Sequence, residues 1–209
     1  MFNLERPPNR VRHGVDAVLT VAGIEVEFEL KSVTTARGGL STVRDLGKDH
    51  IEKWRNKHWI IAFYEGAKIQ DCKYGSPDAM AFWVNKIWSS IKPDFDIAER
   101  VPPLLTLKAM ESVIGKKSVY SLNDAKALHK AQYTASQYKN LMDMVDGYSP
   151  DRMLKIFRDR TEYLIERGST LNNPHISLAF LQALPSLDKK EPAKSLRKLV
   201  RAWLNARPK

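Results

Sequence analysis

Cysteine is almost absent from this 209-residue sequence, in which Cys72 is the single thiol. One cysteine cannot form a disulfide within the chain, and it excludes a zinc site built from cysteines. The five histidines are too scattered to match the short spacings of metal-binding motifs. The residues after Met1 do not form the apolar segment of a secretory signal peptide. We therefore expect a protein of a reducing compartment, the cytoplasm.

Long apolar runs are also missing, because no stretch approaches the roughly 20 residues needed to cross a bilayer. Acidic residues are scarcer than basic ones, 24 against 34, which gives a formal net charge of +10. Such an excess favours a polyanionic partner, and nucleic acid is the commonest one, with an anionic membrane surface as the alternative. We expect a nucleic-acid partner and no membrane.

The periodicity of apolar residues changes near residue 95. Before this point we predict a tight turn at Ala22-Gly23, helices at 50–56 and 77–91, and strands at 15–21, 24–31, 59–64 and 69–74. After it, the helical period dominates in segments 121–131, 149–168, 177–184 and 192–206. We expect an α/β (α+β) fold with a central mixed β-sheet flanked by helices in residues 1–95. Residues 96–209 are expected to form a helical region packed on this core.

Two segments before residue 50 are basic and have no clear period. The first 14 residues, which include Arg12, are expected to form an arm. Residues 32–49 are expected to form a loop, because they are rich in small and hydroxyl side chains and carry Arg37, Arg44 and Lys48. A segment with so little apolar content is expected to become ordered only when its cations meet a phosphate backbone.

An acidic face is predicted on the second strand. Side chains alternate across a strand, so Glu25, Glu27, Glu29 and Lys31 share one face, and the face with Phe28 points to the core. Carboxylates in line repel one another, which is unfavourable unless a cation neutralises them. The ordinary explanation is a solvated face with a cross-strand ion pair. A functional explanation is that these carboxylates bind a metal.

The residue types on this face match those needed for metal-assisted phosphodiester hydrolysis. Mg²⁺ prefers oxygen ligands and keeps several waters, so one or two carboxylates are sufficient to hold it. Asp16 and Glu29 are the candidate ligands, together with the backbone carbonyl of Leu30. Lys31 is the candidate catalytic cation, because its ammonium could hold the attacking water or the scissile phosphate. We expect Mg²⁺ as the cofactor, with Mn²⁺ as a possible substitute.

The set Asp16, Glu29-Leu30-Lys31, a following helix and the buried strand 59–64 resembles the PD-(D/E)xK nuclease superfamily. The phrase Phe-Glu-Leu-Lys-Ser-Val-Thr-Thr, followed by a helix that begins at His50, is similar to type II restriction endonucleases. The resemblance covers residues 15–64. The sequence departs from the motif at Val15, which stands at the position of the proline. Some relatives also use an upstream carboxylate, for which Glu5 is the available residue.

The resemblance implies sequence-specific cleavage of double-stranded DNA with a divalent metal, leaving 5′-phosphate ends. It also implies a homodimer in the cytoplasm of a prokaryotic cell, with the helical region serving dimerisation, DNA contact or both. Candidate DNA-binding residues are the cations around the predicted loop and helix: Arg12, Arg37, Arg44, Lys48, His50 and Lys53. The alternatives are a structure-specific resolvase or repair nuclease, and a non-catalytic DNA-binding protein. The sequence leaves open a role for Glu27 in holding a second metal.

Overall fold

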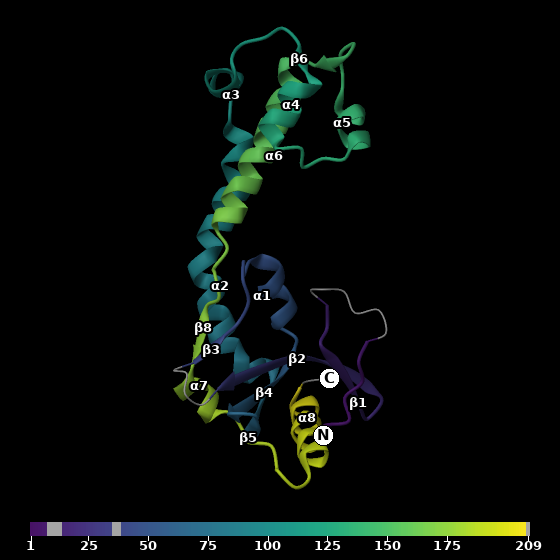
Figure 1. The fold of residues 1–209 in the computed structure, drawn as a ribbon, viewed down its shortest axis with the longest axis vertical. Coiled ribbons are helices and arrows are strands. Elements are labelled where there is room, and N and C mark those ends of the chain that lie inside the picture. The colour runs from purple at the N-terminus through teal and green to yellow at the C-terminus, as the bar shows by residue number, and fades with distance from the viewer. Residues whose placement is uncertain (8–13, 35–38, 208–209) are drawn as a thin grey trace. The chain divides into compact units, whose positions relative to one another are not determined.

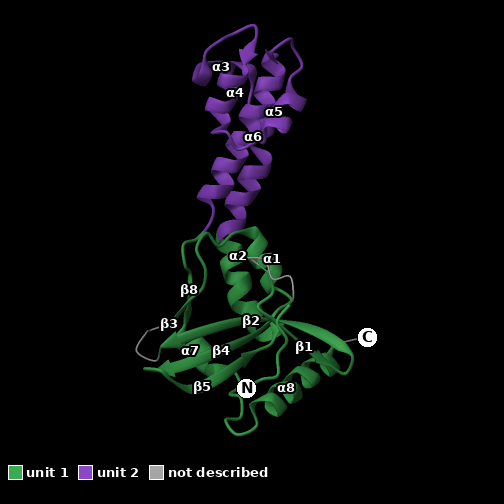
Figure 2. Ribbon diagram, turned by 45° about the vertical axis from the view of Figure 1, so that its right-hand side comes forward, with its two compact units in different colours: residues 1–90, 171–209 green, residues 91–170 purple. Residues whose placement is uncertain are grey.

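The computed structural model describes residues 1–7, 14–34 and 39–207. The contacts divide the chain into two compact units, residues 1–90 with 171–209 and residues 91–170 (Figures 1 and 2). The expected division into 1–95 and 96–209 differs from this one. Residues 171–209 group with the N-terminal unit because they pair with it. Leu46 and Leu171 exchange two backbone hydrogen bonds of 2.8 and 2.9 Å, for example.

The first unit is built on a four-stranded sheet of order β1-β2-β4-β5 (Figure 1). Its strands are β1 (Ala17–Val21), β2 (Ile24–Thr34), β4 (His58–Glu65) and β5 (Lys68–Gly75). β1 and β2 form an antiparallel hairpin, β2 and β4 run parallel, and β4 and β5 are antiparallel. The mixed central sheet expected from the sequence is therefore confirmed. Ala22 and Gly23 both have positive φ, as a tight hairpin turn requires.

Helices cover both faces of this sheet. Side chains of β1 and of the first half of β2 pack with Leu196 and Val200 of α8 (Pro192–Ala206). The opposite face carries Trp59, whose ring lies 5.1 Å from that of Trp54 in α1 (Lys48–Trp54) and 6.4 Å from that of Trp83 in α2 (Pro77–Arg100). β4 is buried along most of its length, as its uninterrupted apolar sequence predicted.

The segment predicted to be a loop is more regular than expected. β2 continues to Thr34, and β3 (Gly39–Ser41) pairs with β8 (His175–Ser177) in an antiparallel ladder. This partner lies more than a hundred residues away, so no local period could reveal the strand. α1 begins after Gly47, two residues before the predicted start at residue 50, and Asp49 lies in its first turn. Residues 35–38 lie outside the described residues, so the expected ordering of this segment on DNA stays a prediction.

Helix α2 is longer than expected. It was predicted to end near Ile91, but it continues through Pro93 to Arg100. A proline inside a helix removes one hydrogen bond and costs about 3 kcal/mol. Ile91 and Ala98, which lie two turns apart, are both about 1% exposed. Their burial offsets that cost and continues the apolar face past the proline.

The second unit is helical. It contains the end of α2 and the segments η1 (Pro102–Leu104), α3 (Leu107–Ile114), β6 (Tyr120–Ser121), α4 (Leu122–His129), α5 (Ala135–Leu141), β7 (Gly147–Tyr148) and α6 (Pro150–Gly168). Its core includes Met153 and Ile156 of α6, both fully buried. The remaining helix of the first unit is α7 (Leu178–Ala183). None of the helices described is long and apolar enough to span a bilayer.

Candidate active site

The β1–β2 hairpin brings Asp16 and Glu29 together. Ala17 pairs with Phe28, so the same register continued by one residue sets Asp16 opposite Glu29. The backbone N–H of Leu30 donates to Asp16 Oδ2 over 3.0 Å. The carboxylate of Asp16 thereby accepts the hydrogen bond that a backbone carbonyl would accept if β1 extended further along β2. This contact fixes one carboxylate of the candidate pair against the strand that carries the other.

Glu29 is buried, although its strand face was expected to be wet. It is 3% exposed, whereas Glu25 and Glu27 on the same face are exposed. The reason is tertiary, since Glu29 pairs across the parallel ladder with Trp59, which belongs to the buried tryptophan cluster. The other strand face differs from expectation as well, because Leu30 is 40% exposed where a core residue was predicted.

Two lysines neutralise the buried carboxylate. Lys31 Nζ lies 2.9 Å from Glu29 Oε1, and Lys53 Nζ lies 3.3 Å from Glu29 Oε2. Both ammonium groups are largely buried, with about a fifth of each side chain exposed. A buried carboxylate without such partners would cost several kcal/mol. Glu29 and Lys31 therefore lie together, as side chains two positions apart on one strand face should, and Asp16 is bound to the backbone N–H of the intervening Leu30.

Lys53 is the residue whose position the sequence did not reveal. It was a candidate for DNA contact, but its ammonium lies at the second oxygen of Glu29. The helix α1 connects the parallel strands β2 and β4 and presents its last turn to this strand face. Lys57, which follows the helix, is 3% exposed and pairs with Glu27 over 3.2 Å. A lysine pair spaced by four residues directly before a buried strand is the signal that could have suggested these contacts.

The second oxygen of Glu29 accepts no hydrogen bond from the described residues, although it is buried. The ion pair with Lys53 has a suitable distance but not the geometry of a hydrogen bond. Among the residues described, no group of three or more histidine, cysteine, aspartate or glutamate side chains could hold a metal ion. The donor set is therefore sparse, consisting of two carboxylates with nearby backbone oxygens. Sparse oxygen sets of this kind suit Mg²⁺, which keeps several of its own waters.

The remaining candidate cations are distributed differently. Arg44 and Lys48 are exposed near the start of α1, where a phosphate backbone could reach them. The ring of His50 lies 5.8 Å from that of Trp54. Arg12 and Arg37 lie outside the described residues. Glu5 joins the edge of β1 by exchanging two backbone hydrogen bonds of 2.9 Å with Val18.

Comparison with known proteins agrees with this architecture. The family model "Restriction endonuclease PvuII" matches residues 1–104, a range that includes the hairpin, α1 and the whole central sheet. No curated protein matches the chain. Members of type II restriction endonuclease families act on DNA and generally use a divalent metal. Through residues 1–104, the chain belongs to the PvuII family of type II restriction endonucleases.

Proposed function

We propose that this protein is a Mg²⁺-dependent endonuclease that cuts double-stranded DNA at a specific sequence and leaves 5′-phosphate ends. One observation carries the proposal. The buried carboxylate of Glu29 lies opposite Asp16 in the hairpin register and within 2.9 Å of the Lys31 ammonium. Hydrolysis of a phosphodiester needs charge neutralisation, a deprotonated water and a stabilised leaving oxygen. The residues of this strand face, with a metal, supply all three.

Asp16 and Glu29 are the side chains that would hold the metal, together with the backbone carbonyl of Leu30, which lies between Glu29 and Lys31 in the sequence. Oε2 of Glu29 supports this assignment, because this buried oxygen accepts no hydrogen bond and has only the Lys53 ion pair, and a buried carboxylate oxygen attracts a cation. A bound Mg²⁺ would supply Lewis acidity and lower the pKa of a coordinated water.

Lys31 is proposed to hold the attacking water or the scissile phosphate. Its ammonium is fixed by Glu29 Oε1 and remains partly accessible to solvent. Lys53, at the other oxygen, is proposed as a second cation for the negative charge that develops on the phosphate. Arg44, Lys48 and His50 are proposed to contact the DNA backbone, together with Arg12 and Arg37. Phosphate contacts position the duplex, and base contacts determine the sequence.

Cleavage of phage DNA by Glu29→Gln and by the matched control Glu25→Gln tests the assignment. Glu25 lies on the same strand face but is exposed, so the control has the same charge change. We expect Glu29→Gln to lose at least about a hundredfold in cutting rate, since a metal site contributes several kcal/mol to such a reaction. Binding measured without metal should change little in either variant. Asp16→Asn and Lys31→Ala should behave like Glu29→Gln.

The same assay tests the metal and the specificity. Cutting should require Mg²⁺ or Mn²⁺, and Ca²⁺ should support binding without cutting. Sequencing the fragment ends should give one recurring sequence with 5′-phosphates. Full cutting by Glu29→Gln, or cutting that survives EDTA, would contradict the proposal. Cleavage confined to branched DNA would indicate a resolvase instead.

We further propose a homodimer. A single hairpin site cuts one strand at a time, and two sites related by a two-fold axis cut both strands of a palindrome at equivalent positions. Helical segments after residue 95 are proposed to supply the self-association surface. Met153 and Ile156 cannot serve it, because both are buried in their own core. Exposed apolar side chains remain in the second unit, including Leu104 (75% exposed) and Val113 (64%).

A further inference from the structure

The second unit contains two short helices joined by a sharp turn. α4 has 8 residues and α5 has 7, and residues 130–134 connect them. Both helices begin with a full capping box, Ser121 with Asp124 and Thr134 with Gln137. The turn begins with two residues of positive φ, Lys130 at 54° and Ala131 at 53°. Capping at both starts and a left-handed turn fix where one helix ends and the other begins.

The inward-facing side chains of α4 and α5 are buried in the core of the second unit. Ala125 and His129 of α4 and Tyr138 of α5 are buried. The ring of Tyr133, in the turn, lies 3.8 Å from that of His129 and 5.3 Å from that of Tyr138. Strand β6 leads into α4, strand β7 follows α5, and the two strands pair. Both helices are therefore anchored to the core of the second unit through buried side chains.

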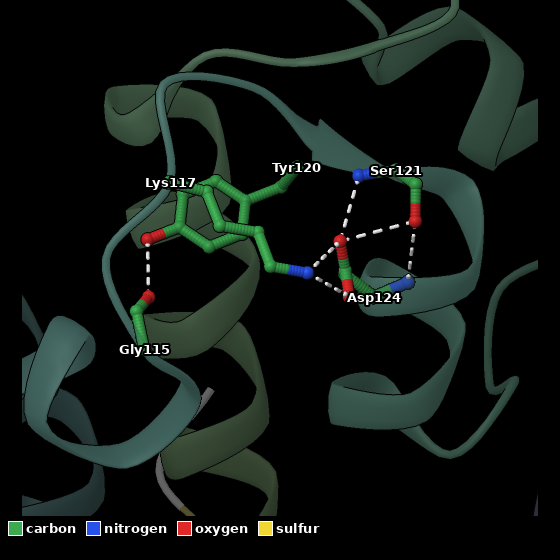
Figure 3. A network of polar contacts seen from close by, with 5 residues as sticks. All are labelled: Gly115, Lys117, Tyr120, Ser121 and Asp124. Carbon is green, nitrogen blue, oxygen red and sulfur yellow. Dashed lines mark hydrogen bonds and ion pairs between the residues drawn. The ribbon is translucent and has the colours of Figure 1, made fainter.

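Internal contacts also fix the start of α4 and neutralise its acidic residue (Figure 3). Asp124 accepts from Lys117 Nζ over 2.8 and 2.9 Å and from the backbone N–H of Ser121 over 2.9 Å. The Lys117 ion pair and these hydrogen bonds lower the pKa of Asp124. At the far end, Asp143 accepts from the hydroxyl of Ser149 over 2.6 Å and lies 3.8 Å from Arg152. Acidic side chains at both ends are thus occupied by partners within the unit.

The outer side of α5 is polar and carries a cation. Tyr138 is buried and Leu141 is half-buried, whereas the exposed side chains are the small Ala135 and the polar Ser136, Gln137, Lys139 and Asn140. Amide, hydroxyl and ammonium groups are those that bind base edges in the major groove. Lys126 of α4 and Lys130 of the turn are exposed as well. The exposed charge of this helix pair is therefore positive, as contact with a phosphate backbone requires.

We propose that α4 and α5 form a helix-turn-helix element that docks α5 in the major groove of double-stranded DNA. This gives the protein a second DNA-reading surface, in a unit that does not contain the catalytic carboxylates. Two consecutive short helices joined by a five-residue turn are the parts from which such an element is built, and in it the second helix enters the groove. Lys139 contacts phosphate or guanine, and Asn140 contacts a base edge. The inference rests on the proposed function in so far as duplex DNA is the substrate.

Two variants of α5 test the proposal through binding in Ca²⁺. Lys139→Ala removes an exposed cation, and Lys155→Ala on α6 is the matched control, because Lys155 is also exposed. With sheared phage DNA, Lys139→Ala should weaken binding and lower the slope of log affinity against log salt by about one. Asn140→Ala should weaken binding to a duplex with the cleavage sequence by about five- to a hundredfold, but not to a random duplex.

The outcomes separate this inference from the proposed function. Wild-type affinity and salt slope in both α5 variants would overturn the helix-turn-helix assignment, even if Glu29→Gln still abolished cutting. Equal binding of an RNA duplex would also overturn it, because the deep, narrow major groove of RNA does not admit a helix. A change in oligomeric mass of Lys139→Ala by light scattering, with unchanged DNA affinity, would assign α5 to self-association. Loss of DNA affinity in the α5 variants supports the inference whether or not the protein cuts.

Discussion

At the scale of single residues, the candidate site depends on the balance of charge around Glu29. Lys31 and Lys53 each approach one oxygen of this buried carboxylate. A divalent metal at the same carboxylate competes with these cations. The site therefore holds two positive charges where the metal would bind, and both lower its affinity for a cation. The two lysines nevertheless have different proposed roles, since Lys31 lies on the strand and Lys53 reaches in from α1.

We predict that Lys53→Met tightens Mg²⁺ binding while it slows cutting. Removal of a positive charge 3.3 Å from Glu29 Oε2 makes the site more negative. The gain should be a few-fold to about tenfold in affinity, as expected for a partly buried charge pair. Isothermal titration calorimetry measures it without reference to activity. Lys48→Met, an exposed lysine at the start of the same helix, is the control and should leave the affinity unchanged. Weaker Mg²⁺ binding in Lys53→Met would contradict the assignment.

At the scale of elements, strand β4 carries a buried histidine that makes stability depend on pH. His58 is 1% exposed, and its Nδ1 lies 2.7 Å from the Tyr74 hydroxyl. Burial, and then the charge of Arg207, lower the pKa of His58 from 6.5 to about 4, against the opposing charge of Asp78. The unfolded chain takes up this proton near pH 6.5, and the folded chain only near pH 4. The stabilisation that His58 contributes is present in full above pH 6.5, and it is lost as the pH falls from 6.5 to about 4.

The expected loss is of order 3 kcal/mol between these pH values. Urea unfolding at about pH 7.5 and about pH 5 measures the part of this loss above pH 5, about 2 kcal/mol, for the wild type, His58→Gln and His175→Gln. All five tryptophans lie in the first unit, so tryptophan fluorescence follows the unfolding of that unit alone. The pH dependence of the free energy of unfolding should become smaller in His58→Gln. It should persist in His175→Gln, because His175 is exposed in the wild type. An unchanged dependence in His58→Gln would refute the explanation.

Helix α8 is expected to be essential to the nuclease unit. Leu196 and Val200 are fully buried against the sheet, and Trp203 Nε1 donates to Asp78 Oδ2 of α2 over 2.6 Å. We predict that Leu196→Ala destabilises the first unit by about 2–5 kcal/mol, as cavities in packed cores do. Urea unfolding followed by tryptophan fluorescence gives this value. Lys198→Ala, on the exposed side of the same helix, is the control and should change stability by less than about 0.5 kcal/mol.

At the scale of the whole molecule, the charge is unevenly divided between the two units. Residues 91–170 carry 13 of the 34 basic and 11 of the 24 acidic residues, so most of the net charge of +10 belongs to the first unit. The long-range attraction of DNA is therefore concentrated on the unit that contains the proposed catalytic residues. The second unit has a net charge of only +2, from 13 basic and 11 acidic residues, so its proposed DNA contact depends on the local arrangement of α4 and α5.

We predict a homodimer in solution, because equivalent cuts in both strands of a palindrome need two sites. Light scattering at micromolar protein, with and without DNA, gives the mass of the protein and the number of chains on each duplex. A dimeric mass is expected in both states. Monomers in both states, with one chain on each duplex, would refute the dimer and indicate an enzyme that cuts the strands one after the other.

The sequence by itself determined the local features of this protein. The turn at Ala22-Gly23 follows from its glycine and the strand at 59–64 from an uninterrupted apolar run. The shared strand face of Glu29 and Lys31 follows from the alternation of side chains, and all three are local properties. The acidic strand face was also visible, because three glutamates at every second position need no partner to be recognised. The capping box at Ser121 likewise depends on residues three positions apart, and it is present in the structure.

Tertiary structure decided which side chains became buried and which segments belong together. Glu29 is shielded from solvent because Trp59 and α1 lie against it. Lys53 forms an ion pair with it because the last turn of α1, the helix between β2 and β4, lies at this point. The pairing of β3 with β8 and the packing of α8 on the sheet join residues more than a hundred positions apart. No local periodicity in the sequence encodes such contacts, because they form only when folding brings distant apolar faces together and buries them.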